Sequence, residues 1–99
     1  MKVHILFKAR FEKPLLDGTK TWTTRSRPYG KAGDTFDAFE ATFIIDTIDW
    51  KQLGEVAAHW KEEGCESMED FIDVWCEIHP RVGYRPDSYF CVHIFHKKV

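Results

Sequence analysis

Apolar and polar residues alternate along much of this chain with a period of two. Residues 3–10 show the alternation first, with Lys8 and Arg10 on the wetter side. A period of two sends successive side chains to opposite faces and predicts a β-strand. Further strands are predicted over residues 21–26, 35–39, 42–48 and 88–96. The last of these is apolar enough to be a central strand of its sheet.

A period near 3.6 replaces the alternation in three places before the last predicted strand. A short helical stretch runs from Phe11 to Asp17 and ends at Gly18, since glycine accepts the left-handed conformation that ends many helices. A longer helix is predicted from Asp49, as N-cap, to Gly64. Its apolar stripe is Trp50, Leu53, Val56, Ala57 and Trp60.

A third helix is predicted from Ser67, with Asp70 completing a capping signature and Pro80 following its end. Its expected apolar face is Met68, Phe71, Ile72, Trp75 and Ile78. The predicted order is therefore strand, short helix, three strands, two helices, strand. This order favours an α+β fold, a small curved mixed β-barrel with short helices, two of them inserted before the last strand.

The composition fits one domain over residues 1–99. At 43% hydrophobic and 15% aromatic residues, the chain can fill one core. It has no 18-residue apolar run, and its first residues are too charged for a signal peptide. We therefore expect a cytoplasmic protein with no membrane partner. The three cysteines show no paired spacing, which predicts reduced thiols.

Charge is distributed unevenly, although the formal net charge is only −2. Residues 1–31 contain eight Lys or Arg and two acids, whereas residues 32–99 contain six Lys or Arg and fourteen acids. This balance excludes a uniformly basic surface for nucleic acid. It allows a local basic mouth for a nucleotide or a short RNA.

The segment from Gly18 to Arg25 concentrates the reactive groups, because an amine, several hydroxyls and a guanidinium fall within it. A lysine beside a threonine can act as base and nucleophile, and an arginine can hold a carbonyl or anionic oxygen. In a regular strand Thr23 and Arg25 share one face, so Lys20 reaches Thr23 only if the backbone departs from the strand. The same alternation also describes an ordinary strand with one wet face.

Two glutamates, Glu62 and Glu63, end the second predicted helix, where carboxylates oppose the negative end of the helix dipole. If Glu63 faces a pocket, its pKa is expected to rise, as a general acid requires. Otherwise both are solvated side chains at a frayed helix end. His59 stands four residues before Glu63, but no third and fourth ligand follow at metal-site spacing, so no metal is expected.

The loop over residues 81–87 carries Arg81, Tyr84 and Arg85. An aromatic ring with neighbouring arginines can stack on a base and contact phosphates. A surface loop with one half-buried tyrosine is an equally good interpretation.

The stretch from Phe11 to Arg25, with its Gly-x-Lys-Thr-x-Thr-x-Arg pattern, and the later Gly33-Asp34 pair resemble the opening of ASCH domains, small relatives of the PUA domain. The second half, from His59 to Pro80, is similar to the bacterial branch that hydrolyses N4-acetylcytidine. The resemblance covers nearly the whole chain and implies a PUA-like β-barrel with a cleft beside the Lys-Thr strand. The chain departs from the pattern at Thr24, where an apolar residue would fit, and in a one-residue gap after Glu63.

This resemblance implies a catalytic set of Lys20, Thr23 and Glu63, with Glu62 as the fallback for the last. Thr23 would attack the acyl carbonyl, neutral Lys20 would take its proton, and Glu63 would protonate the leaving amine or activate water. Backbone N–H groups at the Gly18 turn would hold the oxyanion. Substrate contacts are expected from Arg25, Lys8, Arg10, Tyr84 and Arg85. The scheme needs no metal or organic cofactor.

The alternative is a non-catalytic module that binds RNA or a nucleotide. Its basic strand edge would consist of Lys8, Arg10, Arg25 and Arg27, with Tyr84 stacking on a base. An enzyme needs the Lys20 amine and the Thr23 hydroxyl within roughly 2.6–3.2 Å, or somewhat more without ligand, in a closed pocket. A binding module would hold them apart on an open groove. Either function implies a nucleoside or short RNA as partner, and we expect a monomer or a weak dimer.

Overall fold

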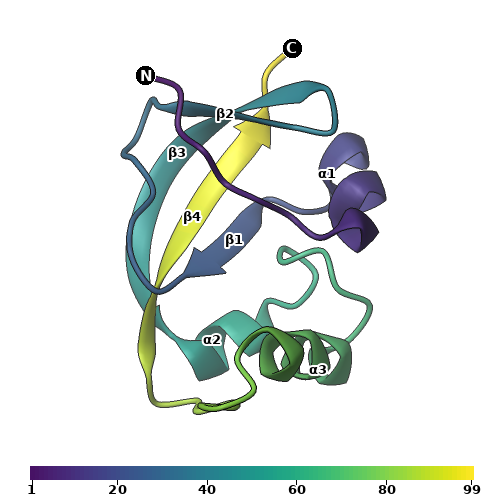
Figure 1. Ribbon diagram of the computed structural model, residues 1–99, viewed down its shortest axis with the longest axis vertical. Helices are drawn as coiled ribbons and strands as arrows, with labels where there is room; N and C mark the ends of the chain where they lie inside the picture. Colours follow the sequence, from purple (N-terminus) through teal and green to yellow (C-terminus); the bar gives the residue numbers. More distant parts are fainter.

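Four antiparallel strands form the curved sheet on which the rest of the molecule is built (Figure 1). The computed structural model, which describes residues 1–99, places them in the order β1-β4-β3-β2. Their bounds are Trp22–Arg25 (β1), Thr35–Ala38 (β2), Ala41–Gln52 (β3) and Tyr89–Lys97 (β4). β4 is therefore central, as its apolar sequence predicts, and the predicted α+β fold around a small, strongly curved sheet is confirmed.

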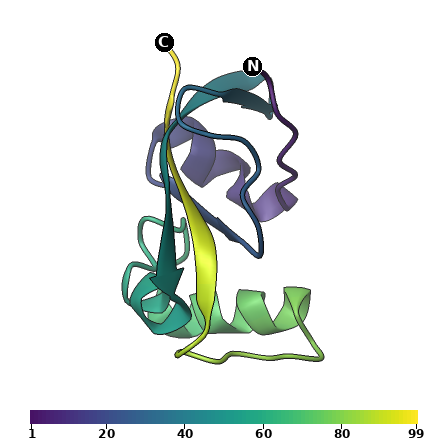
Figure 2. The ribbon, with the colours of Figure 1, turned by 90° about the vertical axis from the view of Figure 1, so that its left-hand side faces the viewer.

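Three short helices accompany the sheet. A 3-10 turn over Ala9–Phe11 runs into α1 (Glu12–Asp17), which ends at Gly18 with a φ of 85°. Helices α2 (Leu53–Ala58) and α3 (Met68–Ile78) are inserted before β4, as predicted. Both lie at the end of the sheet away from the chain termini (Figure 2). None of the helices is long and apolar enough to cross a bilayer.

The long strand β3 bends because its pairing with β4 slips by one residue. The register shifts between Ile45 and Thr47, which leaves Asp46 as an extra residue on β3. Such a bulge bends a strand and increases its twist. The bend brings the far half of β3 and β4 toward α2 and α3 (Figure 1).

The strand predicted over residues 3–10 is not present. Residues 3–8, which we call the strap, form no strand of the sheet. Their one backbone link to it is at the start, where the Val3 N–H donates to the Thr35 carbonyl of β2 in the parallel bridge between Lys2 and Thr35. The sequence predicts a mixed barrel, whereas the structure has an antiparallel half-barrel with the strap beside it. The alternation in the strap reflects burial without strand pairing, since Ile5 is 4% exposed and Leu6 is 84% exposed.

The second predicted helix begins later and ends earlier than its sequence signal suggests. α2 stops at Ala58, so Glu62 and Glu63 lie in a turn after the helix and do not end it. β3 continues to Gln52 because its ladder with β4 extends to the pair Gln52–Tyr89. Trp50 therefore lies on a strand and is 59% exposed, whereas Leu53 begins the helix and is fully buried. Tertiary pairing has overridden the capping signal at Asp49.

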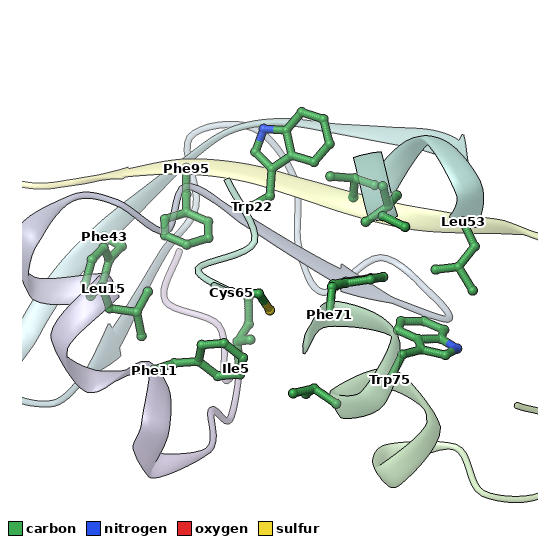
Figure 3. Packing of buried hydrophobic residues seen from close by; sticks show 14 of the residues in the cluster. Ile5, Phe11, Leu15, Trp22, Phe43, Leu53, Cys65, Phe71, Trp75 and Phe95 are labelled. Atoms are coloured by element: carbon green, nitrogen blue, oxygen red, sulfur yellow. The ribbon is translucent and has the colours of Figure 1, made fainter. Parts of the chain in front are cut away.

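Aromatic rings fill the core on the helix side of the sheet (Figure 3). The Phe36 ring lies 5.2 Å from that of Phe43 and 5.1 Å from that of Phe95, centroid to centroid. Helix α3 contributes Phe71 and Trp75 as predicted, together with Val74. The two ends of its expected apolar face, Met68 and Ile78, are about half exposed.

The cap of α3 yields a test of the fold. The Ser67 hydroxyl accepts a hydrogen bond of 3.0 Å from the Asp70 N–H. Ser67→Ala should lower the free energy of unfolding by about 0.5–2 kcal/mol, measured by urea denaturation. Ser88→Ala is the matched control, because the Ser88 side chain makes no hydrogen bond. Equal stability of the two variants would contradict the cap.

Candidate active site

A pocket of about 460 Å³ lies between the edge strand β1, the strap and α3. Its polar wall includes Lys20, Thr23, Thr24, Arg25, Ser26 and Glu63. Its apolar wall includes Phe7 and Phe11 on one side and Phe71, Val74, Trp75 and Ile78 of α3 on the other. These segments are distant in sequence, and the loop that carries Glu63 lies between α1 and α3 (Figure 1).

The free edge of β1 supplies backbone groups to this pocket. Phe95 N–H donates to the Thr21 carbonyl across the sheet, so the alternation of an antiparallel ladder turns Trp22 and Thr24 toward the free edge. Trp22 N–H donates to the Glu62 carbonyl at 2.9 Å. This hydrogen bond holds the loop after α2 along β1. Glu63 is the next residue of that loop.

Lys20 enters the site from the loop before β1, as its predicted place outside the strand requires. Its side chain is 3% exposed. The Nζ atom donates to the carbonyls of Trp22 at 2.7 Å and Glu63 at 2.6 Å, and it lies 4.5 Å from the centroid of the Phe11 ring. Two backbone carbonyls and an aromatic face thus fix the amine in one position.

Glu63 is buried in the pocket and Glu62 points away from it. Glu63 is 5% exposed, with one carboxylate oxygen 3.6 Å from the Lys20 Nζ and the other accepting a hydrogen bond of 2.7 Å from the Thr24 hydroxyl. Glu62 instead contacts His59 Nδ1 at 3.1 Å on the surface. The choice that the sequence left between the two glutamates is thus resolved geometrically in favour of Glu63 as the pocket residue.

Burial shifts the pKa values of Lys20 and Glu63 toward each other. Loss of solvation lowers the pKa of Lys20 and raises the pKa of Glu63, while the opposite charge of each partner acts against both shifts. Low polarity therefore brings the two pKa values toward each other. Burial thus disfavours the charged form of each partner, whereas their mutual attraction favours the ion pair.

Thr23 is buried and lies beside the Arg25 guanidinium. Arg25 Nε donates to the Thr23 hydroxyl oxygen at 3.2 Å, and Arg25 Nη2 donates to the Leu6 carbonyl at 2.7 Å. This confirms that the two side chains share one face, as strand parity predicts. No carboxylate pairs with Arg25, which leaves further N–H donors for a ligand.

The Lys20 amine and the Thr23 hydroxyl line the same pocket but are not hydrogen-bonded to each other. The amine is directed at two carbonyls, and the hydroxyl oxygen accepts from Arg25. Catalytic hydrogen bonds are often long before the substrate binds, so this arrangement is compatible with general base action.

The other predicted contact residues are mostly engaged elsewhere. Lys8 lines the pocket but pairs with Glu77 at 3.0 Å. Arg10 is outside the pocket and binds Asp70 through both terminal nitrogens, at 3.1 and 2.5 Å. Tyr84 and Arg85 are also outside the residues that line the pocket.

The Gly18 turn has no free N–H for an oxyanion, contrary to the sequence expectation. The Gly18 N–H donates to the Leu15 carbonyl, Thr19 N–H to the Asp17 carboxylate, and Lys20 N–H to the Pro14 carbonyl. No cluster of three His, Cys, Asp or Glu side chains is placed to hold a metal ion. Sequence reasoning also missed the Thr24 hydroxyl and the Tyr29 ring, because only the folded chain places them beside Glu63 and Arg25.

Comparison with protein-family models and with curated proteins finds no match to this chain. Solved structures do share its fold. The hypothetical protein PH0355 is 16% identical with a TM-score of 0.73, covering 99% of this chain and all of that one. An ASCH domain from Lactobacillus crispatus is 12% identical with a TM-score of 0.62, covering 97% of this chain and 78% of that one. Protein EF3133 from Enterococcus faecalis is 17% identical, with a TM-score of 0.57 and coverage of 89% and 69%.

Two glycines allow a matched test of the Lys20 position. Gly64 and Gly18 have φ values of 84° and 85°, so alanine at either costs about 1–2 kcal/mol of backbone strain. A Cβ at Gly64 would also stand 2.9–3.1 Å from three carbons of the Lys20 side chain, whereas a Cβ at Gly18 meets nothing. Gly64→Ala should therefore lose about 1–3 kcal/mol more stability in urea denaturation. Equal losses would show that Lys20 is not held where described.

Proposed function

We propose that this chain, which has the fold of ASCH domains, is an amidohydrolase that acts on N4-acetylcytidine or a related N-acylated nucleoside. The observation that carries the proposal is the buried Lys20–Glu63 pair in one pocket with Thr23. Several kcal/mol are needed to bury each such ion, so buried pairs of this kind at a pocket are candidates for chemistry. The fold itself does not define an activity.

In the first half-reaction the buried pair starts as neutral amine and carboxylic acid. Thr23 Oγ1 attacks the acyl carbon, and its proton moves to the Lys20 Nζ. The amide C–N bond then breaks, and Glu63 gives its proton to the leaving amine nitrogen. The acyl group is now an ester on Thr23, with Lys20 as ammonium and Glu63 as carboxylate, an ion pair at the 3.6 Å separation found here.

The second half-reaction restores the starting state with no net proton change. Glu63 takes a proton from water as the water oxygen attacks the ester carbon. Lys20 returns its proton to Thr23 Oγ1 as the ester bond breaks, which releases the carboxylic acid. The hydrogen bond from Thr24 keeps one Glu63 oxygen occupied and leaves the other to face Lys20.

The oxyanion needs donors other than the Gly18 turn. The remaining N–H groups of Arg25 and the free-edge N–H of Thr24 are the candidates that flank Thr23. A cationic donor beside the nucleophile is well suited to a developing negative charge.

The alternative function is a module that binds RNA or a nucleotide without turnover. The lack of a hydrogen bond between the Lys20 amine and the Thr23 hydroxyl favours it, whereas its phosphate contacts count against it. Two of its four proposed phosphate contacts, Lys8 and Arg10, are already paired with Glu77 and Asp70. Saturable binding of a nucleoside or short RNA, with no hydrolysis of any N4-acylated cytidine, would establish the binding module.

Substitution at Thr23 tests the nucleophile. Thr23→Val should abolish release of cytidine from N4-acetylcytidine, measured by chromatography, because no hydroxyl remains to attack. Removing one member of a nucleophile–base unit costs nearly as much as removing both. Thr23→Ser should keep partial activity, and thermal unfolding should show both variants folded. Near-normal turnover in Thr23→Val would refute the assignment.

Glu63→Gln tests the acid, with Glu62→Gln as the matched control one residue away. If the reactive state needs neutral Lys20 and protonated Glu63, activity falls at low pH as the amine is protonated and at high pH as the carboxyl ionises. Glu63→Gln should cut turnover about 100-fold or more and remove the high-pH limb. Glu62→Gln should leave rate and profile unchanged. The reverse pattern would assign the acid to Glu62.

A further inference from the structure

One histidine outside the proposed catalytic set connects two walls of the site. His93 lies in the middle of β4, opposite Thr23 on β1 and Ile48 on β3, and is fully buried. Its Nε2 atom lies 2.9 Å from the Tyr29 backbone nitrogen, and its Nδ1 atom lies 3.2 Å from the Thr23 carbonyl oxygen.

The two partners decide which ring nitrogen carries the proton. A backbone N–H can only donate and a carbonyl can only accept. Nε2 must therefore accept from Tyr29, and Nδ1–H must donate to Thr23. The surroundings admit only the neutral ring with its proton on Nδ1.

Tyr29 depends on this histidine for its place in the pocket. Its ring lines the pocket, 6.1 Å from the His93 ring and 5.9 Å from the guanidinium carbon of Arg25. Residues 26–30 make no other hydrogen bond to the protein. The bond to His93 is thus the one polar anchor of this part of the pocket wall.

We propose that His93 is a positioning residue: as the neutral Nδ1–H tautomer it ties Tyr29 to β1 at Thr23 and so fixes the wall of the pocket beside Arg25. Protonation would place a second N–H opposite the Tyr29 N–H and break the bond. The charged or titratable groups facing the ring are the Arg25 guanidinium from β1 and the Tyr29 phenol from the loop, while β3 presents uncharged Ile48.

These surroundings favour the neutral ring. Burial, the largest cause, lowers the pKa of His93, and the positive charge of Arg25 acts in the same direction. Hydrogen bonding to the backbone of Thr23 and Cys91 acts against this shift without reversing it. A lowered pKa means that the anchor is complete above the ordinary histidine range and weakens as the pH falls below it. We therefore expect the Tyr29 segment to loosen in acid before the sheet unfolds.

The first test uses the unmodified protein and needs no activity. Nitrogen-15 NMR of the imidazole should show a protonated Nδ1 and an unprotonated Nε2 at neutral pH. The protection factor of the Tyr29 amide, the factor by which its hydrogen exchange is slower than in an unfolded peptide at the same pH, should be high at neutral pH. It should fall roughly tenfold or more in acid while the β4 amides keep their protection. A proton on Nε2, or an unprotected Tyr29 amide in the folded protein, would overturn the proposal.

The second test compares variants and rests on the proposed function for its kinetic part. His93→Leu should expose the Tyr29 amide and raise KM about 3- to 10-fold with little change in kcat, because one binding wall is loosened. His93→Gln, which keeps a donor and an acceptor, should restore part of both. His96→Leu, on the same strand but exposed, is the control. Unchanged KM and exchange in a folded His93→Leu variant would overturn the proposal, whereas slow Tyr29 exchange without any hydrolysis would refute only the amidohydrolase.

Discussion

The burial of one lysine amine is the constraint on which the rest of this site depends. Lys20 Nζ has no water to solvate it, so its hydrogen-bonding capacity must be met by protein groups. Those groups are the carbonyls of Trp22 and Glu63 and, at 3.6 Å, the Glu63 carboxylate. The loop after α2 must therefore lie against the free edge of β1, and α3 then follows as the opposite wall of the pocket.

The same constraint accounts for the glycine that follows Glu63. Gly64 has a positive φ, and a Cβ there would stand 2.9–3.1 Å from three carbons of the Lys20 side chain, so a side chain would be both strained and too close. Phe11 and Phe7 cover the amine from the strap side, and Phe7 also lies under the Arg25 guanidinium. The strap is thus held by aromatic and cationic contacts and by the hydrogen bond from Arg25 to the Leu6 carbonyl. Its alternation resembles that of a strand because alternate side chains are buried.

Two histidines of similar sequence context have different roles once the chain is folded. His93 and His96 lie on one strand, but His93 is enclosed between β1, β3 and the Tyr29 loop, whereas His96 contacts Asp46 at the surface. Burial between an N–H donor and a carbonyl acceptor fixes the tautomer of the first. An exposed ring carries no such restriction.

Local sequence determined the elements whose signals lie within a few residues. The Ser67 cap, the Gly18 end of α1, the apolar β4 and the shared face of Thr23 and Arg25 could all be predicted, because capping and strand parity depend on neighbours along the chain. The Gly-x-Lys-Thr pattern likewise pointed to Lys20 and Thr23 as residues of one site.

Only the tertiary structure decided how these groups meet. Glu63 could not be separated from Glu62 in the sequence, since the difference is which of two adjacent side chains turns toward Lys20. The second helix lost its first turn because the β3–β4 ladder took precedence over local propensity. The strap forms no strand, and its alternation follows burial alone. Contacts across tens of residues, such as Thr24 with Glu63 and Tyr29 with His93, leave no periodic trace in the sequence; they arise from the packing that buries the amine.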